Sequence, residues 1–447
     1  MLEGKKKTKD TAIGNEELRK EDERENGQTE EQEPSSKDNH IHKDVATRIE
    51  QELITKDKIS VIRLVDALVM NAAELRASDI HIDPTETAIR VRFRIDGVLH
   101  DNFTFPKEVQ SEMITRIKIL SGLRTDEHQA AQDGRFKIQV EGHGNIDVRV
   151  SIAPTYYGEN CVMRLLASQS QDYTLEKLGF SKTNLKKINQ AINKPYGMVL
   201  ATGPTGSGKT TTLYAILKVL NKKEVSIITI EDPIEYSIEG IDQIQVNART
   251  ELTFAQGLRF ILRQDPNIIM VGEIRDNETA AIAVNAAMTG HLLLSTLHTN
   301  DASTTLPRLL EMGVEPFLIA STVNIAIGQR LVRMICPECK VQKRLTDDEI
   351  AALKTFVPDG ILGNHRDFFI GAGCKSCDMS GFKGRMGIHE VLEVNEKIRE
   401  LIMRRVTASE LKKVAIQEGM IPMLEDGIQK AIQGITTIEE VFRVFHE

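Results

Sequence analysis

Tryptophan is absent from the 447-residue sequence, and aromatic residues make up only 4% of it. Proteins that move along single-stranded nucleic acid need stacking aromatic side chains in a basic groove. The formal net charge of −8 and the sequence pI near 5.9 also give no broad basic surface. Neither nucleic acid nor an anionic membrane is therefore the partner that the composition favours.

Long apolar runs are also absent. No stretch of about 18 uninterrupted apolar residues, the length of a membrane-spanning helix, occurs in the sequence. The start, MLEGKKKTKD, is basic, but the apolar segment of a secretory signal does not follow it. We therefore expect a cytoplasmic protein. Cysteine is scarce, with five residues, and in this compartment spaced cysteine pairs indicate a metal site more than disulfides.

The first part of the chain divides by composition into a tail and a small domain. Residues 1–45 are rich in charged side chains and contain no aromatic residue, so we expect a disordered charged tail, solvated and not anchored in a membrane. Residues 46–168 are expected to form a small α+β domain. TAIRVRFRIDGVLHDNFTF alternates as a half-buried strand does and turns at Asp96-Gly97, and GRFKIQVEGHGNIDVRVSI predicts a second hairpin. Between them, KEVQSEMITRIKILSGL has one apolar helical face.

After a linker expected over residues 169–195, the pattern changes. The short apolar runs GMVLA, VSIITI, NIIMVGE and HLLLSTLH alternate with helical segments over residues 196–335. This alternation is typical of a parallel sheet covered by helices, so the predicted fold class of this core is α/β. A cysteine-bearing element is expected over residues 336–390, followed by a C-terminal helical region over residues 391–447.

Residues 203–210 match the phosphate-loop pattern G-x4-G-K-S/T, after an apolar strand and before a helix. Glycines let such a loop wrap closely, so that its N–H groups point at phosphate oxygens. Lys209 then reaches the β and γ phosphates, and the Thr210 hydroxyl can ligate Mg²⁺. The residues expected to bind ATP are Gly203, Pro204, Thr205, Gly206, Ser207, Gly208, Lys209, Thr210 and Thr211.

Acidic residues follow two of the predicted strands. Glu231 ends SIITIE, and Glu273 follows NIIMVG. In a parallel sheet these ends lie at the same edge as the phosphate loop. Glu273 is the candidate for orienting and polarising the attacking water, and Glu231 for assisting through the magnesium shell. The alternative for both is a carboxylate that caps a helix or lies in solvent.

Histidines and arginines supply further candidates. His291 precedes a predicted strand and His298 ends it; a γ-phosphate sensor and a packing role are equally favoured for them. Arg135 and Arg149 lie on the polar side of the second hairpin. They could neutralise the transferring phosphoryl group, in the same chain or in a neighbour, but the residues by themselves favour a plain solvated strand face.

Four of the cysteines form two pairs, Cys336-x2-Cys339 and Cys374-x2-Cys377. Such pairs close a tetrahedral Zn²⁺ site, and four thiolates leave no open position for a substrate, so the expected role is structural. The segment between the pairs is longer than in common zinc ribbons and must be accommodated as an insertion. Cys161 lies in an apolar run and is expected to be a buried small residue.

Together these motifs resemble the ATPases of type II secretion and type IV pilus assembly, competence pseudopilus relatives included. The resemblance runs from about residue 58 to the end and is carried by RASDIHIDP, RFRIDGVL, QDGRFKI, DVRVS, GPTGSGKTTTLY, IEDPIEY, LRQDPNIIMVGEIRD, MTGHLLLSTLHTNDA, CPEC with CKSC, and EDGIQKAIQGITTIEEVFRV. It implies a PAS-like domain over residues 46–168 and a RecA-like P-loop core, with ATP between them. It assigns Lys209 and Thr210 to the phosphate loop, Glu231 to the aspartate box, Glu273 to the Walker B element, His291 and His298 to the histidine box, and Arg135 and Arg149 to the arginine contributors.

The resemblance also implies a function and partners. The protein would be a homohexamer on the cytoplasmic face of an inner or plasma membrane. ATP hydrolysis would drive a membrane platform protein and, indirectly, pilin-like subunits, with no nucleic acid involved. The cysteine element resembles that of the assembly and secretion branch, not of the retraction motors. Two alternatives are a P-loop motor that translocates nucleic acid and a regulatory nucleotide-binding module without turnover.

Overall fold

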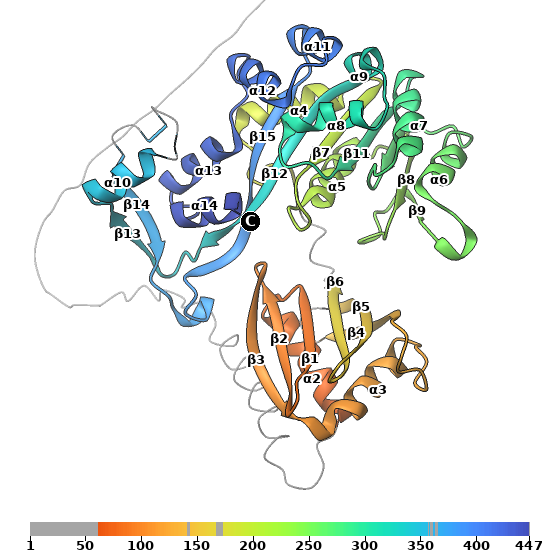
Figure 1. Cartoon of the computed structure of the whole chain (residues 1–447), viewed down its shortest axis with the longest axis vertical. Helices are drawn as coiled ribbons and strands as arrows, with labels where there is room; N and C mark the ends of the chain where they lie inside the picture. The colour runs from red at the N-terminus through yellow and green to blue at the C-terminus, as the bar shows by residue number, and fades with distance from the viewer. Residues whose placement is uncertain are drawn as a thin grey trace, which may run out of the picture.

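The computed structural model contains two main sheets, one in an N-terminal domain and one in the core, and a small sheet beside the core (Figure 1). No helix among the described residues is long and apolar enough to cross a bilayer. The expected tail over residues 1–45 lies outside the described residues. The structure describes residues 61–140, 144–166, 173–355, 357, 361–362 and 365–446.

The N-terminal domain folds, in chain order, from α2 (Val61–Glu74), β1 (Asp79–Pro84), β2 (Ala88–Ile95), β3 (Val98–Pro106), α3 (Gln110–Leu120), β4 (Gln132–Val140), β5 (Gly144–Thr155) and β6 (Gly158–Leu166). The strands form one antiparallel sheet in the order β3-β2-β1-β6-β5-β4. Apolar side chains of α2 and α3 pack on the apolar face of this sheet. Both predicted hairpins and the predicted helix are present. Asp96 and Gly97 take left-handed φ angles of 48° and 90° in the first turn, as a tight hairpin requires.

The core consists of α4 (Lys182–Ile192), β7 (Gly197–Thr202), α5 (Lys209–Leu220), β8 (Ile227–Glu231), β9 (Asp242–Gln245), α6 (Phe254–Ile261), β10 (Ile268–Val271), α7 (Asn277–Met288), β11 (Leu292–Leu297), α8 (Ala302–Glu311), α9 (Pro316–Thr322) and β12 (Val323–Ile335). The four predicted apolar runs are the parallel strands β7, β8, β10 and β11. Helices α4 and α5 pack on one face of the sheet and α6 to α9 on the other. The predicted α/β fold is confirmed, and the C-terminal strand ends meet at one edge.

One strand of the core sheet differs from the expected organisation. β15 (Phe382–Glu393) pairs antiparallel with β12 and forms an edge of the seven-stranded sheet. Most of β15 falls within residues 336–390, which were assigned to the cysteine element. No local pattern predicts this pairing, because residues 336–381 separate the two strands. β12 pairs with β7 only as far as Gly328, so the rest of the β12–β15 pair runs past the sheet edge as a two-stranded ribbon.

The outer end of this β12–β15 ribbon carries the cysteine element, with β13 (Lys340–Arg344), α10 (Asp347–Lys354) and β14 (Asp367–Gly371) (Figure 1). The C-terminal region is helical, as expected, and consists of α11 (Glu396–Met403), α12 (Ala408–Gln417), α13 (Met423–Ile432) and α14 (Ile438–His446). Helices α11 and α12 pack into the core beside α8 and α9, whereas α13 and α14 pack on the ribbon and the cysteine element.

Glu440 fastens α14 to the ribbon and makes the fold sensitive to pH. This residue is only 2% exposed, and it accepts from Arg333 Nη2 at 2.8 Å and from Arg443 Nη2 at 2.6 Å. Burial raises the pKa of Glu440, but the two guanidinium groups more than offset this and lower it from 4.5 to about 2. The ionised carboxylate therefore stabilises the fold above pH 4.5, and this contribution is lost as the pH falls toward 2.

We expect Glu440→Gln to lower the free energy of unfolding by about 3 kcal/mol at pH 7. The difference from the wild type should shrink as the pH falls toward 2 and disappear below pH 2, because the wild-type carboxyl group is then protonated. Urea titrations across this pH range measure it. Glu311→Gln, which removes an exposed partner of Arg308, is the control and should change stability by less than about 0.5 kcal/mol. A loss of the same size at pH 7 and at pH 2 would contradict the electrostatic explanation.

Candidate active site

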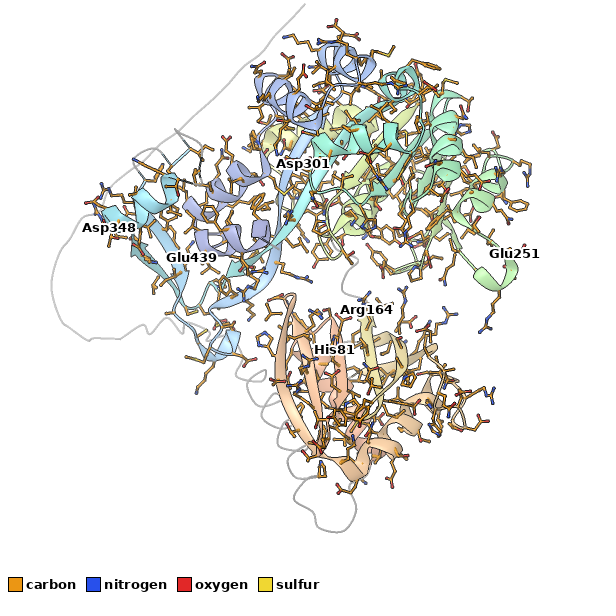
Figure 2. The ribbon with its side chains drawn as sticks, viewed as in Figure 1. His81, Arg164, Glu251, Asp301, Asp348 and Glu439 are labelled. Carbon is orange, nitrogen blue, oxygen red and sulfur yellow. The ribbon has the colours of Figure 1, made fainter. Side chains whose placement is uncertain are left out.

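A cavity of about 1510 Å³ lies between the N-terminal domain and the edge of the core sheet where the phosphate loop is placed. It is larger than the roughly 300–1,000 Å³ of most small-molecule sites. From the N-terminal domain, Asp79, Arg94 and Arg164 line it, and Figure 2 shows Arg164 at the end of that domain nearest the core. The domain also contacts the ribbon, where the Asp96 carboxylate accepts the Gly384 N–H at 2.8 Å. The cavity is thus built from both parts of the chain.

The loop between β7 and α5 has a backbone that only glycine adopts easily. Gly203, Gly206 and Gly208 have φ angles of 147°, 80° and 85°. At Gly203 an added Cβ would lie 2.4 Å from the carbonyl oxygen of Gln329, so no side chain fits there. Helix α5 begins at Lys209, directly after the loop. Its first N–H groups have no partner within the helix, and a helix N-terminus of this kind binds phosphate.

Lys209 lies over the phosphate loop. Its Nζ donates to the carbonyl oxygens of Gly203 at 2.9 Å and Pro204 at 3.0 Å. Burial lowers the pKa of Lys209, and the charge of Glu273 works in the opposite direction. Thr210 and Thr211 follow on α5 and line the same cavity. The ammonium group is therefore held where phosphate oxygens would enter.

Gln329 supports the loop from β12, and no sequence motif pointed to it. Its Nε2 donates to the Ser207 carbonyl at 2.7 Å, and its Oε1 accepts from the Thr212 hydroxyl at 2.8 Å. The residue is buried. An amide side chain within the mostly apolar run IAIGQ is the signal that could have identified it, since a buried amide needs polar partners.

Glu273 follows β10 and lies beside His298, which follows the neighbouring strand β11. The Glu273 carboxylate is almost buried, and its Oε2 lies 2.9 Å from His298 Nε2. Its Oε1 lies 2.6 Å from Arg275 Nη2. Parallel pairing of β10 with β11 brings these groups together, although 24 residues of chain separate positions 273 and 298. Arg275 was not among the predicted residues, and its place two positions after a strand-end acid is its only signal in the sequence.

Glu231 also reaches the cavity, but protein groups hold its carboxylate. It accepts hydrogen bonds from the Tyr214 hydroxyl, from Thr229 Oγ1 at 2.7 Å and from Gln243 Nε2 at 3.0 Å. Burial raises the pKa of Glu231, against the effect of these three donors. Because Tyr214 belongs to α5, Glu231 ties the end of β8 to the helix that carries Lys209. These donors leave one acceptor site, on Oε2, for a role in a magnesium shell.

Three predicted residues do not join this group. His291 precedes β11 and therefore lies at the opposite edge of the sheet, about 20 Å from the other end of the strand. Its Nδ1 lies 2.9 Å from the Ala286 carbonyl oxygen. Arg149 contacts the Ile234 carbonyl and lies 3.4 Å from Glu235. Arg135 pairs with Arg149 across the hairpin and is exposed. The arginines that line the cavity are instead Arg76, Arg94, Arg164, Arg275, Arg330, Arg385 and Arg443.

The four paired cysteines meet at the outer end of the ribbon. Their Sγ atoms all lie within 4.8 Å of one another, and the separations for Cys336 to Cys374, Cys339 to Cys377 and Cys374 to Cys377 are 3.8, 3.8 and 3.7 Å. A tetrahedron with Zn–S bonds of about 2.3 Å has edges of about 3.8 Å. The cluster therefore fits Zn²⁺. Cys336 directly follows β12 and Cys377 precedes β15, so a metal here would fasten both strands of the ribbon.

The sequence of this chain is similar to those of known proteins. The family described as type II/IV secretion system protein matches residues 55–443. The chain is 45% identical over 404 residues to the type IV pilus assembly ATPase PilB of Myxococcus xanthus, covering 90% of this chain and 71% of that protein. It is 47% identical over 392 residues to the type II secretion system protein HxcR of Pseudomonas aeruginosa, covering 88% of this chain and 79% of that protein.

Solved structures agree with the fold. The pilus retraction motor PilT with bound ADP is 27% identical, with a TM-score of 0.58 over 84% of this chain and 95% of that one. The ATPase DotB of Legionella pneumophila has a TM-score of 0.63 at 22% identity, over 86% of this chain and 95% of that one, and supports the fold alone. From the family match and these relatives, the chain belongs to the type II/IV secretion system protein family and is one of its ATPases.

Proposed function

We propose that this protein is a homohexameric ATPase that powers assembly of a type IV pilus or a type II secretion pseudopilus by driving a membrane platform protein. The observation that carries the proposal is the convergence of the phosphate loop, Glu273 and His298 on one cavity. The names of its relatives support the choice of machine. The proposed place of work is the cytoplasmic face of an inner or plasma membrane, with pilin-like subunits as indirect partners and no nucleic acid.

The proposed roles follow the geometry of the cavity. Lys209 and the loop N–H groups bind the β and γ phosphates. The Thr210 hydroxyl would hold Mg²⁺, which when bound neutralises charge on the phosphate oxygens. Glu273 orients the attacking water, and His298, on the other carboxylate oxygen, senses the γ-phosphate. Glu231 keeps α5 in place through Tyr214.

Three residues take other places in the proposal. Arg135 is exposed, and we assign it to the nucleotide of a neighbouring subunit. Arg149 we assign to the contact between the N-terminal domain and residues 234–235. His291 is left out of the catalytic set, because the length of β11 separates it from the phosphate loop.

The proposed domain organisation keeps a PAS-like unit over residues 46–168, a linker over residues 169–195 and a RecA-like core from residue 196. We extend this core beyond residue 335 to include β15, because its hydrogen bonds are made with β12. The cysteine element would bind Zn²⁺ as a structural ion. Its thiolates are all used by one tetrahedral site, so it takes no part in hydrolysis.

Phosphate release from ATP and Mg²⁺ by the purified full chain tests this function, together with its mass by light scattering. We expect turnover in a hexamer, and Lys209→Ala should lower turnover about 100-fold or more, because it removes a charged group aimed at the phosphates. Turnover no higher than that of Lys209→Ala would favour a regulatory nucleotide-binding module. Stimulation by DNA that disappears at high salt would favour a nucleic-acid motor.

A further inference from the structure

Two side-chain donors contact the carboxylate of Glu273, and one of them carries a positive charge. Arg275 Nη2 lies 2.6 Å from its Oε1 and His298 Nε2 lies 2.9 Å from its Oε2. Lys209 is close enough for its ionisation to respond to the charge of Glu273. All of these residues line the same cavity as the phosphate loop. A site with these groups can bind an additional negatively charged group.

Arg275 and Glu273 differ in their freedom to move. The Glu273 side chain is 9% exposed, whereas that of Arg275 is 66% exposed. The backbone beside Arg275 is held, because the next residue, Asp276, caps α7 by accepting the Thr279 N–H at 2.8 Å. The guanidinium group can therefore turn to another partner within the cavity while the carboxylate and the backbone stay in place.

The Arg275 contact conflicts with the work proposed for Glu273. A carboxylate that orients a water molecule accepts a hydrogen from it, and Arg275 competes for the lone pairs of Oε1 through a short charge-assisted contact. A γ-phosphate offers a guanidinium group a partner with more charge and with paired oxygens of matching geometry. Binding of a nucleoside triphosphate supplies this competitor, and binding of a diphosphate does not.

We propose that Arg275 is a positioning residue that changes partner with the nucleotide. In the nucleotide-free and ADP states it pairs with Glu273, and with ATP it moves to the γ-phosphate and frees Oε1 for the attacking water. Glu273 thus becomes available only when there is a phosphate to transfer. This inference rests on the proposed function and concerns the same cavity.

Arg275→Gln tests the partner change through binding, without hydrolysis. We expect its affinity for a non-hydrolysable ATP analogue to fall about 10-fold, the worth of one hydrogen bond to a charged group. Its affinity for ADP should stay within about twofold, and kcat should fall at least 10-fold. Arg275→Lys keeps the charge and should recover most of the lost analogue affinity. Isothermal titration and steady-state kinetics on the full chain measure these values.

The control is Arg259→Gln, which removes an arginine that pairs at 2.7 Å with the exposed Glu278 on the neighbouring helix. It should change none of the three values. Equal losses of ADP and analogue affinity would overturn the proposal, and so would a loss of kcat with both affinities unchanged. If Arg275→Gln does not fold, Arg275→Met, which keeps the length of the side chain without its donors, takes its place, and equal losses of analogue and ADP affinity in that variant count against the proposal. A wild-type chain that binds neither nucleotide would instead overturn the proposed function.

Discussion

Glu273→Gln is expected to bind ATP as tightly as the wild-type chain while its turnover falls about 100- to 10,000-fold, the usual worth of a general base. Glutamine has nearly the same shape as glutamate, so the end of β10 should keep its packing. Its amide can no longer polarise the attacking water as a carboxylate does. The phosphate loop and Lys209 are unchanged, so the affinity for the nucleotide should stay the same. Analogue binding and phosphate release, measured on the same preparation, separate the two effects.

Glu278→Gln provides the matched control for this experiment. Glu278 belongs to the first turn of α7, a few residues after Glu273, and its side chain is exposed. It should keep normal turnover. Near-normal turnover in Glu273→Gln would remove Glu273 from the water-orienting role. Loss of nucleotide binding in that variant would show that the carboxylate holds the loop together and does not serve the chemistry.

Cys377→Ser is expected to abolish metal binding and to destabilise the chain by several kcal/mol, because structural zinc contributes its binding energy to folding. The Cys377 Sγ accepts N–H bonds from Gly381 and Cys374, both at 3.3 Å, which favours the thiolate that a metal needs. Metal analysis should find about one zinc per wild-type chain and close to none in the variant. Hydrogen exchange should accelerate in the first residues of β15, which the cluster holds against β12.

Cys161→Ala is the control for this prediction. Cys161 is a fully buried free cysteine of the N-terminal domain, so the variant can lose packing energy but should keep its metal. A chelator added to the wild type should reproduce the effect of Cys377→Ser on thermal unfolding. A wild-type chain purified without metal and fully stable, or a Cys377→Ser variant with a full complement of zinc, would contradict the assignment.

Local patterns accounted for much of this fold. The four apolar runs of the core are strands because each is short, fully buried and bounded by turn residues, and these are properties of neighbouring residues. The turn at Asp96-Gly97 was predictable for the same reason. By contrast, the pairing of β15 with β12 was not predictable, because a strand's partner is set by tertiary packing and β12 lies on the other side of the cysteine element in the sequence.

In the candidate site, too, some features follow from neighbouring residues and others from tertiary packing. The phosphate loop could be read from the sequence because its glycines, its lysine and the following helix are consecutive, and the loop closes within its own length. The cysteine cluster was predictable because two Cys-x2-Cys pairs in a protein expected to be cytoplasmic indicate a metal site more than disulfides. Parallel sheet geometry also placed Glu273 and His298 at the edge where the loop lies.

What only the tertiary structure decided is which groups meet across that edge. Contacts such as Gln329 with Ser207, Arg275 with Glu273, and Asp96 with Gly384 depend on side-chain direction and on how two domains face each other. Periodicity cannot supply either, because it records which face of an element is apolar and not what that face opposes. The sequence by itself therefore determined the chemistry available to this protein, and the packing of the N-terminal domain and ribbon against the core decided which arginines reach the cavity.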